Sequence, residues 1–505
     1  MRVTGAFLVF LVTFCSFAYF WQGTGPNQNS RLDLTRAIVS AGSLEIDAYA
    51  ANTFDQSTRN GHVYSDKAPG LSFAAVLPCA AYYLMTDSAD SGQPPIDPVL
   101  AWFLTVSVIG LTSALAASAI FFVLSSLGAG VWASFATTVA WAFGTNAFAY
   151  SSLFLAHQFV AALVTISFAA LWRVRSRPSQ SPLSQTMLLA LAGFAASWAS
   201  ISEYPVGLIA AALFLYGLAG LGPRRMFPFV LAGLPPLLLL AAYNHACFGS
   251  PFRLGYQDLS VPQYRAIIER GFFGIGLPDP AVMFQMAFGE FRGLLPLSPF
   301  LVLALPGFVL MLRSRDFRHE GLLCLASAGS LWLLSSSYQR WDGGMSMGPR
   351  YFVPALPFLV LPAGLAIGAI GSLRRAFWRL PAIGVTAVAI LSSVCVCSAA
   401  VAVMPEFPDV TLPAAPVSGM DVPDVKHPLT QFVFPLLARG QVGIKASLPN
   451  GNLSFATWIP GHESDAANVG EALGLTGLAS LLPLLALWAL ALGAMLRCRQ
   501  SSNIP

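Results

Sequence analysis

Charged residues are scarce in this chain. Only 10% of its 505 residues are Asp, Glu, Lys or Arg, whereas 56% are hydrophobic. A soluble domain carries about 25% charged residues, so the composition predicts a polytopic membrane protein. The net charge is only +4 and the basic residues are scattered, which argues against a nucleic-acid-binding surface.

The chain also lacks the cysteine patterns of a disulfide framework or a zinc site. Its seven cysteines stand mostly inside apolar runs, where packing is their usual role. A Gly-rich phosphate loop and a soluble cytosolic domain are both missing, which argues against an enzyme that uses nucleotide sugars. Internal repeats are missing as well, and the centres of the apolar runs carry almost no charge. A transporter is expected to carry ionisable residues in the middle of its spans and to show a repeat between its two halves, so both absences argue against one.

Long apolar runs dominate what is present. A run of roughly 18 residues or more is needed to cross the hydrocarbon of a bilayer. We therefore expect an all-α polytopic membrane protein with about 12 transmembrane helices, in a range of 11 to 13. The first run stays bulky to its end and lacks a small-x-small cleavage site, so we interpret it as an uncleaved span. The predicted spans are 3–21, 99–125, 131–151, 154–172, 185–202, 205–222, 227–244, 295–312, 321–338, 352–371, 380–403 and 472–496.

The stretch 70–86, GLSFAAVLPCAAYYLMT, is ambiguous by length alone. If it does not cross, the short connections on the N-terminal side hold most clustered arginines and only two acids, Asp316 and Glu320. The positive-inside rule then places both chain ends in the cytoplasm. We therefore predict an interfacial or re-entrant helix, interrupted at Pro78. The arginines on that side are Arg2, Arg173, Arg175, Arg177, Arg224, Arg225, Arg313, Arg315, Arg318, Arg374, Arg375, Arg379, Arg497 and Arg499.

This topology divides the chain into three parts. Residues 1–403 are expected to form a transmembrane domain whose first external loop, 22–98, carries the functional site. Residues 404–471 are expected to form an external cap, and their alternating short apolar runs, VGIKASL and LSFATWI, indicate a small β structure. Residues 472–505 are expected to hold the last transmembrane helix and a cytoplasmic tail.

The polar stretch 27–69 stands out from its apolar surroundings. A long connection in a compact protein is either functional or disordered, and we interpret this one as an active-site loop. It ends in the densest polar cluster of the chain, in which Tyr64, Asp66 and Lys67 bring an acceptor and an ammonium to a membrane surface. Lys67 suits a phosphate, and Asp66 suits a general base or a metal ligand. A solvated loop with local ion pairs is the alternative reading.

Two further external stretches carry polar groups. In 338–351, YQRWDGGMSMGPRY, Arg340 and Arg350 suit bidentate binding of a phosphate. Arg350 begins a span, so snorkelling to the interface is its alternative role. The stretch 243–256 is expected mainly to pack against the first loop. The pocket residues expected from these stretches, from the first loop and from the start of a span are Trp341, Asp342, Tyr351, His62 and His157.

These residues resemble a known group of enzymes. The segment 64–69, YSDKAP, is similar to the Tyr-x-acid-Lys-Pro-Pro segment that ends the first external loop of GT-C membrane glycosyltransferases. The protein O-mannosyltransferase-like group and the lipid A aminoarabinose transferases are the nearest in pattern. The resemblance covers about residues 3–225 and is looser beyond, although GPRYFVPALPF (348–358) also resembles a segment of bacterial members.

One departure from that family concerns the start of the loop. The resemblance implies an Asp-Glu pair there, but the corresponding residues are Asn27 and Gln28, and an amide is no general base. Either another carboxylate has taken over that role or the chain belongs to a diverged subgroup. The candidates from the loop are Asp66, Asp47 and Asp33.

The resemblance implies an inverting transfer of a sugar from a polyprenyl-phosphate donor to a lipid, glycan or protein acceptor on the external face. A carboxylate would take the proton of the acceptor hydroxyl, which is typically worth 10²–10⁴-fold in rate. Lys67, Arg31 and Arg350, with Tyr64 and Arg340 beside them, would bind the leaving phosphate. No cofactor is certain from the sequence, although a divalent Mg or Mn ion with Asp66 as ligand fits the pattern.

Two other classes of protein remain open at this point. One is a multi-pass transporter or lipid flippase, and the other is a non-catalytic membrane protein that keeps the fold, which Asn27 and Gln28 favour. The bilayer itself is an expected partner, whereas nucleic acid is not. The uncleaved first span and the short polar connections suggest a bacterial inner membrane.

Overall fold

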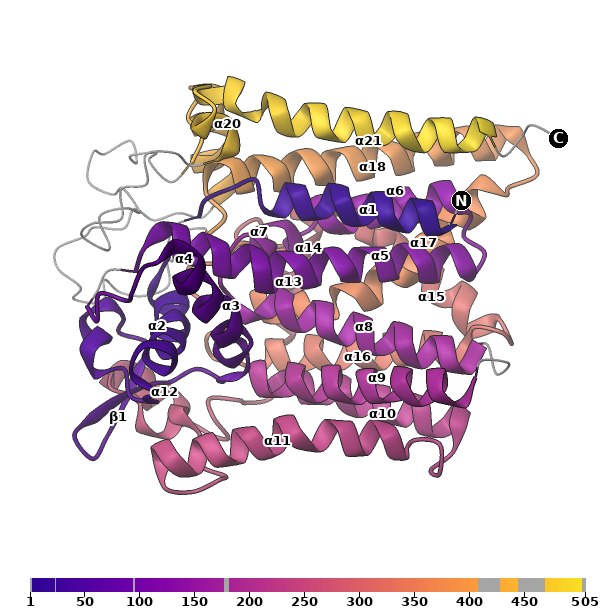
Figure 1. Ribbon diagram of the computed structural model, residues 1–505. Helices are drawn as coiled ribbons and strands as arrows, with labels where there is room; N and C mark the ends of the chain where they lie inside the picture. The colour runs from indigo at the N-terminus through magenta and orange to yellow at the C-terminus, as the bar shows by residue number, and fades with distance from the viewer. Residues whose placement is uncertain are drawn as a thin grey trace.

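The computed structural model describes residues 2–22, 24–93, 96–176, 181–406, 427–443 and 468–501. Its long helices lie side by side in one bundle, with both chain ends at the same end of that bundle (Figure 1). The short helices and the one hairpin of the first loop gather at the opposite end, which we call the loop end. Both termini therefore lie on one side of the bundle, as the charge pattern predicts. That this side faces the cytoplasm stays a prediction.

In the described part of the chain, each predicted span overlaps a helix of the bundle. These helices are α1 (Arg2–Phe17), α5 (Leu111–Ser126), α6 (Val131–Phe143), α8 (Ala156–Ser176), α9 (Pro182–Ser202), α10 (Gly207–Leu221), α11 (Phe227–Phe248), α15 (Ala304–Arg313), α16 (Arg318–Ser336), α17 (Leu356–Gly371), α18 (Ala376–Val403) and α21 (Leu482–Ser501).

Shorter elements connect the long helices. They are α2 (Pro26–Ala41), η1 (Asp47–Asn52), β1 (Gln56–Arg59), β2 (His62–Ser65), α3 (Gly70–Thr86), α4 (Pro98–Leu104), η2 (Thr105–Gly110), α7 (Ala147–Ser151), η3 (Tyr204–Val206), η4 (Gly255–Asp258), α12 (Pro262–Ile268), α13 (Pro280–Phe288), α14 (Leu294–Leu297), η5 (Pro299–Leu303), η6 (Arg350–Ala355), η7 (Leu429–Val433), α19 (Phe434–Ala438), α20 (Val469–Ala472) and η9 (Gly477–Leu481).

The expected number of about 12 spans is not confirmed by helix length. Eight continuous helical stretches in the described ranges are long and apolar enough to cross a membrane. The stretch 131–151 is divided at Gly144, the residue that follows α6. The backbone of α18 lies close to this glycine, since a Cβ there would be 3.1 Å from the Val394 nitrogen. The stretch 295–312 is divided at Ser298. The chain is nevertheless an integral membrane protein of helical, multi-pass character.

Helix α3 lies along α2 at the loop end and does not pass through the bundle. Its first residue, Gly70, contacts the end of α9, where the Trp198 indole donates to the Gly70 carbonyl oxygen at 2.9 Å. Next to it, the Ser72 hydroxyl donates to the Arg31 carbonyl oxygen of α2 at 2.8 Å. Pro78 lies inside this helix without ending it, so the predicted interruption is wrong. The location beside α2 agrees with the predicted interfacial helix.

The first loop folds into α2, η1 and an antiparallel hairpin. Pro26 begins α2, and Gly42, with a φ of 62°, ends it in the left-handed conformation that glycine favours. In the hairpin, Arg59 pairs with His62 across the two-residue turn Asn60-Gly61. Both turn residues have positive φ, which suits the twist of such a hairpin. Asp66 and Lys67 follow directly, so the hairpin fixes their position.

A small apolar cluster fastens this loop to the bundle. Tyr64 of β2 packs against Phe248 of α11 with their ring centroids 5.6 Å apart, and residues of α2 and η1 join them. The segment after α11 also contacts the hairpin, because the Ser57 hydroxyl donates to the Gly255 carbonyl oxygen at 2.7 Å. The predicted packing of 243–256 against the first loop is therefore confirmed. Most of the predicted β cap, residues 407–426 and 444–467, lies outside the described residues.

Candidate functional site

The centre of the site is an ion cluster around Lys67. The Lys67 ammonium lies 2.9 Å from the Asp55 carboxylate and 3.1 Å from that of Asp66. The exposed fractions of the three side chains are only 11%, 14% and 4%. Lys67 is one of three lysines in a chain that uses arginine almost everywhere else. Two carboxylates therefore share the Lys67 ammonium group in a place that is largely closed to water.

Burial and charge change the protonation of this cluster in opposite ways. Burial raises the pKa of Asp66 to about 6, although the positive charge of Lys67 acts against it. For Lys67, burial acts to lower the pKa, but Asp55 and Asp66 outweigh it and raise the value to about 12. Lys67 is thus a permanent cation at neutral pH, whereas Asp66 stands within reach of a protonation change.

Arg31, a predicted phosphate ligand, makes its hydrogen bonds to groups of the protein itself. Its Nη2 donates to the Glu203 carboxylate at 2.7 Å, its Nη1 donates to the Ala68 carbonyl oxygen at 3.0 Å, and its Nε donates to the Asn27 side chain at 3.3 Å. Arg31 therefore links α2 to the end of α9 and also to the residues just before α3. A phosphate that Arg31 binds, as predicted, would have to displace Glu203.

Arg350, the other predicted phosphate ligand, has no such partner. Its Nε is buried without a hydrogen bond, and its Nη2 makes only a long contact of 3.4 Å with the Tyr351 hydroxyl. No carboxylate of the described residues lies within ion-pair distance of it. Gly343, with a φ of +73°, makes room for the side chain, because a Cβ there would stand 2.8 Å from the Arg350 Cγ.

The charges of this region converge on His157, which begins α8. Arg350, Arg31 and Lys67 all act electrostatically on its ring. The ring packs edge-on against Tyr150 and Tyr351, with centroids 5.7 Å and 5.9 Å away. Three cations that are far apart in the sequence therefore act on one buried imidazole, whose Nδ1 also lies 3.9 Å from the Glu203 carboxylate. That His157 lines a pocket stays a prediction.

Asp33, a predicted candidate base, lies instead in a closed network. It is fully buried, accepts from the Asn52 amide at 3.0 Å and pairs with Arg36 at 3.3 Å. Arg36 in turn binds Asp90, which lies beyond α3, at 2.6 Å. Burial raises the pKa of Asp33 to about 7, and Arg36 acts against this rise. These groups join α2 to the chain after α3, and nothing in this arrangement turns Asp33 toward a ligand.

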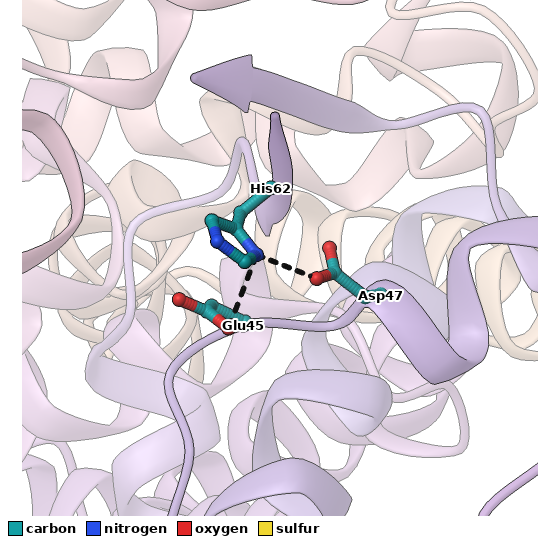
Figure 2. Close-up of side chains that lie close together, drawn as sticks. All are labelled: Glu45, Asp47 and His62. Carbon is teal, nitrogen blue, oxygen red and sulfur yellow. Dashed lines mark hydrogen bonds and ion pairs between the residues drawn. The ribbon is translucent and has the colours of Figure 1, made fainter. Parts of the chain in front are cut away.

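Asp47, the third candidate base, lies at the protein surface beside the hairpin. Figure 2 shows its carboxylate and that of Glu45 converging on the His62 ring. The His62 Nδ1 is 2.8 Å from Asp47 and 3.3 Å from Glu45, and all three side chains are well exposed. The hydrogen bond with Asp47 and the charge of Glu45 raise the pKa of His62. This cluster lies apart from the ion cluster around Lys67, which is buried.

Glu45, Asp47 and His62 are also the candidate ligands for the expected metal ion. Of the described residues, they alone bring three metal-ligand side chains together, with ligand atoms within 4.8 Å of one another. Carboxylate and imidazole ligands suit Zn²⁺ or Mn²⁺. Asp66 fits a metal less well, because Lys67 already supplies its positive partner. A divalent ion at this loop would therefore be held by Glu45, Asp47 and His62.

The other predicted residues are only partly brought to the site. Tyr64 lies in the apolar cluster against α11, with its hydroxyl 3.4 Å from Glu45. Arg340 pairs with Asp342 at 3.2 Å. Burial acts to raise the pKa of Asp342, but Arg340 and the Gly344 amide outweigh it and hold that pKa below its usual value. Trp341 packs against the main hydrophobic core, so of this stretch Arg350 and Tyr351 face the site.

Sequence reasoning missed several groups of the site. Tyr204 and Tyr256 stack edge-on with centroids 6.1 Å apart, and both respond to the charges of Asp66, Glu203 and Arg31. Glu406 is the other omission. Its carboxylate accepts a hydrogen bond from the Gln28 amide at 3.0 Å, across 378 positions of sequence. Tyr256 ends the polar stretch 243–256, which the sequence marks mainly for packing, whereas neither a motif nor a period marks Tyr204 or Glu406.

The sequence matches no protein-family model and no curated protein. Among solved structures, the chain is similar to apo ArnT from Cupriavidus metallidurans, with 17% identity and a TM-score of 0.47 over 77% of this chain and 64% of that chain. For the same protein bound to undecaprenyl phosphate, the identity is 16% and the TM-score 0.45, over 82% of this chain and 66% of that chain. For the oligosaccharyltransferase of Archaeoglobus fulgidus with a tethered acceptor peptide, the identity is 11% and the TM-score 0.46, over 79% of this chain and 55% of that chain. This chain spans less than two thirds of each of those chains.

Proposed function

We propose that this protein transfers a sugar from a polyprenyl-phosphate carrier to a hydroxyl-bearing acceptor at the membrane surface. The observation that carries the proposal is Arg350, a half-buried side chain whose Nε is buried without a hydrogen bond and which has no carboxylate partner among the described residues. Leaving a buried charge uncompensated is costly, so such a group is expected to meet an anion from outside the protein. A phosphate or pyrophosphate, which a guanidinium binds bidentately, satisfies it.

The location of the site favours an anion that is attached to a lipid. Helix α3 borders the ion cluster, and its outer side exposes Leu77, Leu84 and Met85. Exposed apolar side chains beside a buried ion cluster suit a carrier whose tail stays in the bilayer. Lys67 and Arg350 would then be the cations that meet the phosphate of the carrier.

The chemistry asks for charge stabilisation and for a proton acceptor. When the bond between the sugar and the carrier breaks, negative charge develops on the carrier phosphate, and Lys67 and Arg350 stabilise it. The acceptor hydroxyl must lose its proton to a carboxylate of the pocket. Of the three candidates from the sequence, Asp66 alone belongs to the buried ion cluster, where it also holds Lys67 in place.

The test uses the purified full chain in liposomes with undecaprenyl-phosphate sugars as donors and a cell-envelope extract as acceptor. Release of free undecaprenyl phosphate is followed for the wild type, for Asp66→Asn and for Asp87→Asn. Asp87 is exposed and has a left-handed backbone that Asn tolerates, so it is a matched control. We expect release by the wild type and the control and a strong loss for Asp66→Asn. Absence of release by the wild type with every donor would contradict the proposed function.

A further inference from the structure

Glu406 differs from the other carboxylates at the loop end. Buried or half-buried acids there are paired with cations: Asp33 and Asp90 with Arg36, Asp55 and Asp66 with Lys67, Glu203 with Arg31, Asp258 with Arg253, and Asp342 with Arg340. In the described part of the chain, no Lys, Arg or His lies within ion-pair distance of Glu406. Its exposed fraction is 8%, and its one hydrogen bond comes from the neutral amide of Gln28.

The backbone on both sides of this contact is fixed. Residues 401–406, which include the end of α18, are all buried. The side-chain amide of Gln22 donates to the Val401 carbonyl oxygen at 3.1 Å. Gln28 stands in the first turn of α2, where its own side-chain oxygen accepts from the Gly25 amide at 2.7 Å. That bond orients the Gln28 NH₂ group toward Glu406. The carboxylate is therefore held by one oxygen, Oε2, while Oε1 accepts no hydrogen bond from the described residues.

Glu406 belongs to the same electrostatic neighbourhood as the phosphate-binding groups. Arg350 acts on Glu406 and is itself acted on by Asp55, the partner of Lys67. Tyr150 of α7 responds to both Arg350 and Glu406. Among the described residues, Gln28 from α2 therefore contacts the carboxylate, while Arg350 from η6 and Tyr150 from α7 interact with it through charge.

We propose that Glu406 is the catalytic residue that takes the proton of the acceptor hydroxyl, an inference that rests on the function proposed above. The hydroxyl proton passes to Oε1 of Glu406 as the hydroxyl oxygen forms a bond to the anomeric carbon of the sugar. The bond from that carbon to the carrier phosphate breaks, and its electron pair leaves with the phosphate oxygen, which Lys67 and Arg350 stabilise. Glu406 then returns the proton to water, and Asp66 serves to position Lys67.

The protonation behaviour of Glu406 suits this role. Burial raises its pKa to about 7, while the Gln28 amide and the charge of Arg350 act against the rise. A general base works best when its pKa lies near the working pH. Asp66 is less suitable, because its Oδ2 accepts from Lys67 at 3.1 Å, and a proton on Asp66 would weaken the hold on that lysine.

The test compares Glu406→Gln with Glu406→Asp in the liposome assay. Glu269→Gln is the matched control, because Glu269 is exposed at the end of α12. We expect Glu406→Gln to lower kcat by about 10²–10⁴-fold, with the KM for the lipid donor little changed. Glu406→Asp keeps a carboxylate and should recover part of the lost kcat. In the wild type, kcat should fall as the pH drops through about 7, and the residual rate of Glu406→Gln should lack this fall.

The outcomes separate the two proposals. Wild-type kcat and an unchanged pH profile in Glu406→Gln would overturn the role of Glu406 and leave the proposed function intact. Loss of undecaprenyl phosphate binding by both Glu406 variants would show that the residue is structural, and would overturn it as well. Absence of transfer by the wild type would overturn the proposed function itself, and the catalytic role of Glu406 with it.

Discussion

Two arginines at the loop end, Arg36 buried and Arg350 half-buried, have opposite surroundings. Arg36 of α2 is bound by Asp90 at 2.6 Å and by Asp33 at 3.3 Å, and its guanidinium lies 4.2 Å from the centre of the Tyr49 ring. Arg350 has neither a carboxylate partner among the described residues nor a short hydrogen bond. The charge of Arg36 is neutralised by carboxylates of the protein, whereas the charge of Arg350 has no carboxylate partner among the described residues.

This difference separates structural charges from functional ones better than burial does. Arg36 is fully buried and Arg350 is only half-buried, so burial alone would mark Arg36 as the more unusual of the two charges. A closed set of ion pairs gains nothing from a ligand, because every charge already has its partner. An open set with a surplus guanidinium gains a partner when an anion binds. The predictions below test this contrast, from the largest expected effect to the smallest.

Arg36→Ala should show the cost of opening the closed network. It would leave Asp33 and Asp90 without their cation, and breaking a buried pair in this way costs about 3–5 kcal/mol. Denaturation in mixed micelles should therefore show a large loss in the free energy of unfolding. A variant as stable as the wild type would mean that the Asp33–Arg36–Asp90 network does not hold α2 in place.

Arg350→Ala should have the reverse pattern. Removing a group that stabilises transition-state charge costs about 10²–10³-fold in kcat, and no ion pair within the described protein is lost. Carrier release in liposomes should fall by that factor, while the midpoint of thermal unfolding stays within a few degrees of wild type or rises. A strong fall in stability with normal turnover would reverse the contrast between the two arginines.

Gly343→Ala should displace the Arg350 side chain without removing it. The new Cβ would stand 2.8 Å from the Arg350 Cγ and Nε, on a backbone with a φ of +73°. We expect the KM for the donor to rise about tenfold, which is the effect of roughly 1.4 kcal/mol. Gly222→Ala is the matched control, since it has a φ of +79° and no atom within 4 Å of the new Cβ. Equal effects of both changes on KM would assign the loss to backbone strain alone.

His62→Ala should have the smallest effect, because the cluster in Figure 2 is well exposed. Asp47 and Glu45 raise the pKa of His62 in the folded protein. Its contribution to stability is therefore full below the unfolded pKa of about 6.5 and is lost as the pH rises through the folded value. Thermal unfolding should show the wild type to be more stable than the variant at pH 5.5, with the difference gone at pH 9. The same difference at both pH values would rule out this ion pair.

Much of the fold could be predicted from the sequence, because its signals are local. Apolar length marks the helices, and the arginines at one end of the bundle explain why both termini lie together. The hairpin also has a local signal, since Asn60-Gly61 is a strong turn sequence. The number of spans was less secure, because breaks such as Gly144 depend on a neighbouring helix.

The site could be predicted only in part, because partnership is not local. The sequence shows that Asp33, Asp47 and Asp66 share one loop, but not that Asp33 is bound through Arg36 to Asp90. It points to Arg31 and Arg350 alike, although Glu203 occupies Arg31. Glu406 meets Gln28 only after the chain has crossed the bundle many times, and no pattern near either residue predicts the contact.

The central claim is that the open site around Arg350 receives a lipid-linked phosphate. Equilibrium binding of undecaprenyl phosphate to the full chain in nanodiscs tests it most directly, because this carrier is common to every sugar donor considered. Arg350→Ala is compared with Arg270→Ala, a change at an exposed arginine of the loop end. The account predicts saturable binding that Arg350→Ala weakens at least about tenfold, or by roughly 1.4 kcal/mol, and that Arg270→Ala leaves unchanged. Equal binding by Arg350→Ala and the wild type would contradict it.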